Sequence, residues 1–177
     1  GNAFWAGMAL DRCHEEFASL RDKIARLGSA SRLHYPDAMR QVVENLRGNA
    51  TRPDHLAGAL FDIDAMLPKH EERNADTLCY LDHFLEATLA LYFGEIERAL
   101  EHSRAAHAFE AGEIGYPQLA SRFVEALAVV TAARRAAPGK RRRMTREIAR
   151  SRRRFRDWAK RSPDCALNKH QLIEAEY

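Results

Sequence analysis

The stretch of sequence that decides the fold is residues 78–109, LCYLDHFLEATLALYFGEIERALEHSRAAHAF. Its first half repeats apolar residues at helical spacing over 81–91, and its second half does so again over 96–106. Gly94 lies between the two halves, where the chain must turn tightly. The stretch therefore predicts two helices joined at a glycine turn, which is a helix hairpin. Because a hairpin of this kind cannot bury its apolar face alone, the rest of the chain must pack on it.

Small residues occur where the two helices of this hairpin must approach each other. They are Ala87, Gly94, Ala99 and Ala106, and their spacing resembles that of a tetratricopeptide (TPR) unit. The Trp and Leu-Gly positions and the final proline of the TPR pattern are absent. The resemblance implies an all-α protein, a TPR-like right-handed superhelix of antiparallel helical hairpins. Hairpin lengths differ along the chain, so we expect this superhelix and not a regular TPR array.

Composition agrees with a single all-α domain over residues 1–177. Of the 177 residues, 46% are hydrophobic and 30% are charged, which suits a charge-rich helical protein with a sizeable core. No apolar run approaches the roughly 20 residues of a membrane helix, and residues 1–27 carry charges throughout, unlike a signal peptide. Cys13, Cys79 and Cys165 lack CxxC spacing, so we expect reduced cysteines, two or three of them in the core, and a cytoplasmic location.

Proline and glycine divide the remaining chain into further helices. Gly28 suits the end of a first long helix, Thr51 suits the start of a shorter one, and Pro68 is expected to break that helix. A loop is expected at 112–115. The last helix reaches the end of the sequence without a capping signal, so we expect the natural protein to continue. The expected helices cover residues 2–27, 35–47, 51–67, 117–135, 140–161 and 165–177.

The C-terminal segment carries a more specific resemblance. Residues 156–164, RDWAKRSPD, and residues 167–176, LNKHQLIEAE, match a Trp-Ala pair, a Cys/Ser-Pro pair and a helix of the form Lys-His/Tyr-x-Leu-Ile/Val-Glu-Ala-Glu. This segment resembles one in large bacterial multidomain signalling proteins, where a TPR-like region lies between a predicted ATPase module and sensory, histidine-kinase or serine/threonine-kinase modules. Weaker features of the same family occur in residues 41–51 and 92–99. The matching residues are Trp158, Pro163, Lys169, Leu172, Glu174, Ala175 and Glu176.

This resemblance implies a non-catalytic scaffold for protein interaction and signal relay, and a chain that is part of a larger protein. It brings no catalytic residue to this sequence, because the ATP-binding and kinase motifs belong to other parts of such proteins. The residues agree. Pro138-Gly139-Lys140 lacks the first glycine and the Ser/Thr of a phosphate-binding loop, and no HExxH, GxSxG or HRD string occurs. We therefore expect no enzyme activity and no cofactor in this segment.

Histidines and acids show no metal-binding spacing. His102 and His107 lie about 140° apart around a helix, too far for joint ligation of one ion. His83 and Glu86 share a helix face but lack a third ligand, so a surface hydrogen bond is expected. Asp62-x-Asp64 lacks the glycine and the distal glutamate of a calcium loop. A solvated or salt-bridged helix surface is the preferred interpretation for two further sets, Glu97 with Glu101, and Lys169 and His170 with Glu174.

The abnormal feature of the sequence is its charge distribution. Residues 134–161 hold 14 of the 28 lysines and arginines against only two acids, a local net charge of +12. Because the whole chain carries +3, the remainder carries −9. Such asymmetry indicates an electrostatic partner. The residues expected to face that partner are Arg142, Arg146, Arg150, Arg153 and Arg154.

Three interpretations of this basic helix stay open. It can be solvated or paired within the chain, or it can bind an acidic protein surface. Alternatively, the protein can be a nucleic-acid-binding helical regulator that uses the Arg-rich helix 140–161. Phe155 and Trp158 lie on its apolar stripe and suit the core, which leaves phosphate contacts and little sequence readout for nucleic acid. The stripe is too narrow for a membrane surface. We prefer a protein partner, either another module of the same protein or an acidic partner surface.

Overall fold

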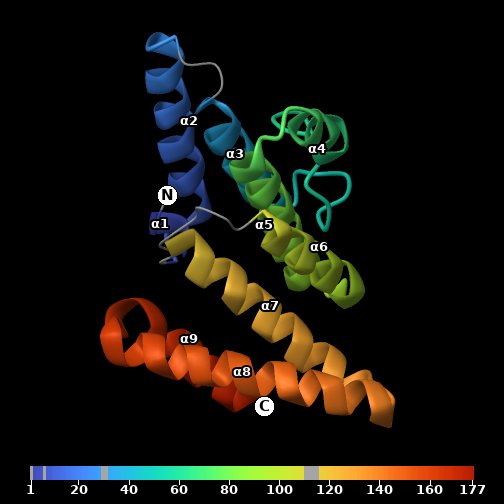
Figure 1. Cartoon of the computed structure of the whole chain (residues 1–177). Coiled ribbons are helices and arrows are strands. Elements are labelled where there is room, and N and C mark those ends of the chain that lie inside the picture. The colour runs from blue at the N-terminus through green and yellow to red at the C-terminus, as the bar shows by residue number, and fades with distance from the viewer. Residues whose placement is uncertain (1, 6, 29–31, 110–115) are drawn as a thin grey trace.

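In a computed structural model the chain is all-α, as the sequence predicts (Figure 1). The structure describes residues 2–5, 7–28, 32–109 and 116–177. Among these residues no strand forms, and the one β-type contact is an isolated antiparallel bridge between Ala57 and Asp62. The helices are α1 (Asn2–Trp5), α2 (Leu10–Arg26), α3 (His34–Leu46), α4 (Ile63–Glu72), α5 (Asp76–Tyr92), α6 (Ile96–Ala108), α7 (Tyr116–Arg135), α8 (Pro138–Arg161) and α9 (Pro163–Glu176).

Most consecutive helices pack on one another from one end of the molecule to the other, and α3 and α4 both pack on α5 (Figure 1). α2 packs on α3 at one end, and α5 pairs with α6 near the centre. α7 contacts α5, α6, α8 and α9, and so joins the central pair to the α8–α9 pair at the other end. This order places the basic helix α8 on the outside of the stack, away from α2 (Figure 1).

α5 is the central helix, and its middle part is buried on all sides. Every residue of the run 82–90 is buried, including four polar ones. Ala99 on α6 is fully buried, as expected for a small residue where α6 packs against α5. Gly94, between the two helices, has a φ of +85°, in the left-handed region that favours glycine. The predicted hairpin with its glycine turn is therefore confirmed.

The core has three parts along the stack. The first joins α2, α3 and α5 around residues such as Met39 and Leu85. The second joins α6, α7 and α8 around residues such as Leu100 and Ile148. The third joins α7, α8 and α9 through Ala126, Phe155 and Ile173. Cys13 and Cys79 are buried and Cys165 is exposed, so two cysteines are core residues, as expected.

The predicted packing of Trp158 is confirmed in part. Its indole is half-buried against the third core cluster, 5.1 Å from the Phe155 ring in an edge-to-face arrangement. Ile148, which lies on the same helix, belongs instead to the second cluster. The two residues are ten positions apart on a 24-residue helix, so they meet different neighbours along its length.

Two predicted helices differ from the structure. The helix expected over 2–27 is interrupted at Gly7, where φ is +85°. The helix expected from Thr51 to Leu67 is wrong, because residues 51–62 are non-helical and α4 begins only at Ile63.

Tertiary contacts explain why residues 51–62 are non-helical. The buried side-chain amide of Asn45 donates to three carbonyls of the loop, those of Arg52, Pro53 and His55, and so fixes the loop in a non-helical path. Pro68 lies inside α4 and does not end it. The helix loses one backbone hydrogen bond there, while Ile63 and His70 on either side are buried. The expected loop at 112–115 lies outside the described residues.

Candidate functional site

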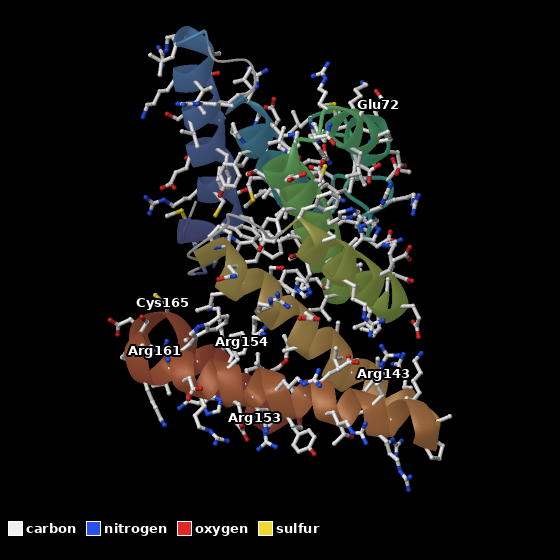
Figure 2. All side chains as sticks on the ribbon, viewed as in Figure 1. Glu72, Arg143, Arg153, Arg154, Arg161 and Cys165 are labelled. Carbon is white, nitrogen blue, oxygen red and sulfur yellow. The ribbon has the colours of Figure 1, made fainter. Side chains whose placement is uncertain are left out.

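α8 turns one side toward the core and its arginines toward solvent. It begins at Pro138, whose fixed φ suits a first helical position. Met144, Ile148 and Phe155 are its buried residues, at spacings that place them on one stripe. Figure 2 shows that Arg143, Arg153 and Arg161 are spread along the length of the helix. The predicted partner-binding residues, all exposed, are Arg142, Arg146, Arg150, Arg153 and Arg154, and we call them the arginine face.

Other arginines of the region are paired with acids of the same chain. The Arg152 guanidinium makes a bidentate contact with the Glu174 carboxylate, which raises the pKa of Arg152 and lowers that of Glu174. The expected salt-bridged surface at Glu174 is thereby confirmed, and intramolecular pairing accounts for part of the basic segment. The other pairs are Arg134–Glu176 at 2.8 Å and Arg143–Glu147 at 3.4 Å.

The arginine face is different, because within the part of the chain that the structure describes none of its five members forms an ion pair with an acid. Arg154 lies over the Trp158 ring, 5.9 Å from its centroid. Arg142, Arg146, Arg150 and Arg154 follow one another at i,i+4 spacing, where like charges repel. The helix therefore carries a row of positive charge that its own acids leave uncompensated.

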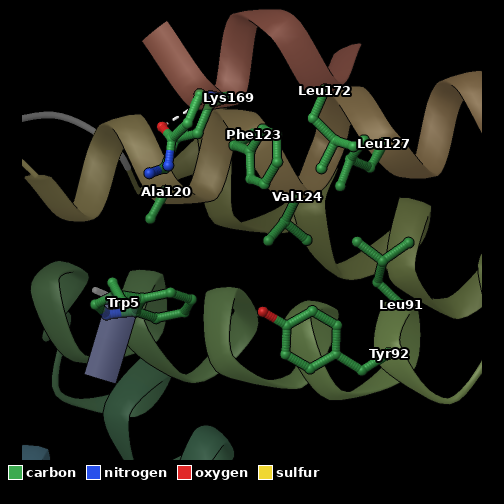
Figure 3. Close-up of a pocket in the computed structure, with 10 residues that line it drawn as sticks. Trp5, Leu91, Tyr92, Ala120, Phe123, Val124, Leu127, Lys169 and Leu172 are labelled. Carbon is green, nitrogen blue, oxygen red and sulfur yellow. Dashed lines mark hydrogen bonds between the residues drawn. The ribbon is translucent and has the colours of Figure 1, made fainter. Parts of the chain in front are cut away.

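An apolar groove of about 380 Å³ lies between α5, α7 and α9 (Figure 3). Phe123 and Leu127 from α7 and Leu172 from α9 lie on one side of it, and Trp5 lies on the other (Figure 3). The Lys169 ammonium at its edge donates to the Cys165 carbonyl at 3.2 Å, and burial lowers its pKa. Lys169 is thus buried and not on the solvated surface that the sequence suggested. The groove offers hydrophobic contact, and its lining includes no acid or histidine.

Buried polar residues of α5 form a second set of candidate sites. Asp82 is fully buried and faces two histidines from other helices. The His70 Nδ1–H of α4 donates to Asp82 Oδ2 at 2.7 Å. His34 Nε2 of α3 lies 2.8 Å from Asp82 Oδ1. The three residues, here called the His–Asp–His cluster, place one ligand atom each within 4.8 Å of one another.

Glu86 organises a neighbouring cluster, and it is not the surface residue that the sequence suggested. Its carboxylate is fully buried and accepts hydrogen bonds from the Leu56 backbone N–H at 2.7 Å and from His55 Nδ1 at 2.9 Å. The Arg98 guanidinium of α6 lies 3.3 Å away. Burial alone would lower the pKa of His55, but hydrogen bonds to Glu86 and Asp64 outweigh it and raise that pKa. The cluster ties the 51–62 loop to α5 and α6.

His83 is also buried, and it pairs with His102 of α6. Their Nδ1 atoms lie 3.0 Å apart, so one ring must donate and the other accept. Burial and the nearby His102 lower the pKa of His83 to about 4. The expected surface role of His83 is therefore wrong, whereas Glu97 and Glu101 are exposed as expected. Spacing along one helix compares His102 only with His107, whereas the histidine that contacts His102 is His83 of another helix.

One sequence signal pointed to these clusters. Asp82, His83, Glu86 and Thr88 interrupt an otherwise apolar helix in the stretch predicted to be central, and polar residues in such a helix must find partners when buried. The sequence does not predict which residues pair with these polar side chains, because His34, His55 and His70 lie in other segments of the chain.

Comparisons with models of protein families, with curated proteins and with solved structures give no match to this chain. Among the described residues, no helix combines the length and the apolar character needed to cross a bilayer.

Proposed function

We propose that this chain is a non-catalytic scaffold for protein interaction and signal relay, and that it binds an acidic protein surface through the arginine face of α8. In this proposal the stacked helices form a TPR-like superhelix within a larger regulatory protein that carries ATPase or sensor-kinase modules. The observation that carries it is the row of exposed arginines that form no ion pair with any acid among the described residues.

The packing of α8 favours a protein partner over nucleic acid. Phe155 is fully buried and Trp158 is half-buried against α7 and α9. Phe155 cannot stack on an unpaired base, and Trp158 exposes only part of its ring for such stacking, which is how aromatic residues contribute to single-strand binding. A carboxylate surface also suits the arginines, because a guanidinium pairs with a carboxylate in a bidentate geometry, as it does with a phosphate. Arg152 and Glu174 already show such a pair in this region.

Fluorescence anisotropy with two labelled probes tests this proposal. One probe is a Glu-rich helical peptide, and the other is a random DNA duplex, each titrated between about 50 and 200 mM salt. We expect the peptide to bind, and the duplex to bind no more tightly than nonspecific contacts allow, with a Kd of about 10⁻⁴ to 10⁻⁶ M at physiological salt.

Two triple variants with the same change in net charge provide the control. Arg150→Glu, Arg153→Glu and Arg154→Glu together should weaken peptide binding roughly 10–100-fold. The matched variant reverses three exposed charges of α2, Arg12→Glu, Lys23→Glu and Arg26→Glu, and should bind nearly as the wild type does. Equal losses in both variants would mean that net charge alone drives binding, and the arginine face would have no specific role.

Binding of nucleic acid through α8 is the other possible outcome of this test. Tight duplex binding by the wild type, with a log–log salt slope of about −0.9 for each phosphate neutralised, would reject the protein proposal. The slope should then flatten in the α8 variant and remain in the α2 variant. The open reading frame around this sequence gives an independent check, because a P-loop ATPase upstream or a kinase downstream is expected for the proposed scaffold.

A further inference from the structure

We propose that the His–Asp–His cluster is a binding site for a divalent transition-metal ion, with Zn²⁺ as the best match to its ligands. His34, His70 and Asp82 come from α3, α4 and α5, and all three are buried. Two imidazole nitrogens and one carboxylate oxygen are a ligand set typical of Zn²⁺ and of other first-row divalent ions. Each residue contributes one ligand atom, and these atoms lie within 4.8 Å of one another.

The hydrogen bonds of the cluster are incomplete. His34 Nε2 and Asp82 Oδ1 are 2.8 Å apart, but their orientation is not that of a hydrogen bond. Within the described part of the chain, both ring nitrogens of His34 and the Oδ1 atom of Asp82 therefore lack a hydrogen-bond partner. Buried polar atoms without partners are rare in folded proteins and costly. A cation held between the three residues would supply the missing interaction.

The neighbouring Glu86 cluster provides an internal comparison. It also joins a buried carboxylate of α5 to a histidine, yet both of its carboxylate oxygens accept hydrogen bonds, one from His55 and one from the Leu56 backbone. A purely structural carboxylate is expected to be satisfied in this way, although Arg98 Nε beside Glu86 lacks a hydrogen-bond partner among the described residues. In the His–Asp–His cluster, one helical turn away on α5, the unsatisfied atoms include one carboxylate oxygen and both ring nitrogens of one histidine.

An ion can reach the cluster from solvent. A surface cleft of about 760 Å³ is lined by His34 and His70, with Phe61, Asp62 and Met66 among its other walls. With three protein ligands and a cleft beside them, the site leaves a fourth coordination position for water or a small ligand. This arrangement differs from a closed structural zinc site, in which four protein ligands surround the ion.

Metal titration of the tag-free chain, after dialysis against a chelator, tests the inference. Co²⁺ serves as a visible probe for the Zn²⁺ site, and we expect one equivalent of Co²⁺ per chain, displaced by Zn²⁺. At a Zn²⁺ concentration one hundred times its Kd, the Tm should rise by about 5–10 °C. Absence of stoichiometric binding in the wild type would overturn the inference, whatever the variants do.

Variants assign the ligands. His70→Gln and Asp82→Asn should each lower metal affinity at least tenfold and abolish the Tm increase, whereas His55→Gln in the Glu86 cluster should retain both. Circular dichroism checks that each variant is folded. If a ligand variant does not fold, proton NMR of the Co²⁺-bound wild type replaces it, since two coordinated imidazoles give two paramagnetically shifted ring N–H signals. Binding that survives both ligand variants, or shifted signals from other histidines, would contradict the assignment.

Discussion

Asp82 and Glu86 lie one helical turn apart on α5, both are fully buried, and each holds a histidine from a different segment of the chain. Asp82 accepts a hydrogen bond from His70 of α4 at 2.7 Å, and Glu86 accepts one from His55 of the preceding loop at 2.9 Å. The central helix thus fixes the irregular part of the fold through polar contacts, while its apolar residues fix the neighbouring helices.

Removing the Glu86 carboxylate should destabilise the protein strongly. In Glu86→Ala, the Leu56 N–H and the His55 ring lose their acceptor, and the Arg98 guanidinium loses a neighbouring charge. Loss of one partner from a buried charged network costs about 3–5 kcal/mol in the free energy of unfolding. Urea denaturation measures it, with Glu97→Ala, an exposed acid of α6, expected to change the value by less than about 0.5 kcal/mol. Similar values for the two variants would mean that Glu86 has no structural role.

Enlarging Ala99 should overpack the contact between α5 and α6. Its side chain is fully buried, so Ala99→Leu should lower the free energy of unfolding by about 1–3 kcal/mol. Ala108→Leu, at an exposed position of the same helix, is the matched control and should change stability little. An unchanged Tm for Ala99→Leu would show that α6 can move away from α5 without cost.

Phe155 should contribute more to stability than Trp158. The Phe155 side chain is fully buried between α7, α8 and α9, and Phe155→Ala should cost about 3–5 kcal/mol. Because the Trp158 indole is only half-buried, Trp158→Ala should cost about 2 kcal/mol. Chemical denaturation of the two single variants compares them, and a larger loss for Trp158→Ala would reverse this ranking.

Acidification should weaken the fold through His83. Burial and His102 lower the pKa of His83 to about 4 in the folded protein, and unfolding returns it to about 6.5. Between these values the unfolded chain binds more protons than the folded one, so the free energy of unfolding falls as pH falls. The loss from this residue is at most about 3 kcal/mol.

Urea denaturation at several pH values, on the wild type and on His83→Gln, isolates this contribution. His55 acts in the opposite direction, because its pKa is raised in the folded state and its stabilisation is lost as pH rises through that pKa. The difference between wild type and variant cancels such shared effects. Parallel pH profiles for the two proteins would exclude the histidine pair as the cause of acid sensitivity.

Local patterns in the sequence determined the helices and the turn at the centre of the fold. The apolar spacing of 81–91 and 96–106 predicted α5 and α6, and Gly94 predicted the turn between them, because helical periodicity and a left-handed glycine are properties of a few neighbouring residues. The same reasoning placed Phe155 in the core and the arginine face in solvent. Charge and periodicity along one helix suffice for such assignments.

Tertiary structure alone decided which distant residues meet. Asn45 holds residues 51–62 out of a helix, against the local signal of Thr51, because hydrogen bonds from another helix outweigh a modest local preference. Likewise, spacing within one helix cannot bring together His34, His70 and Asp82, which belong to three helices. Their meeting depends on how α3, α4 and α5 pack, and packing is a property of the whole chain and not of any segment of it.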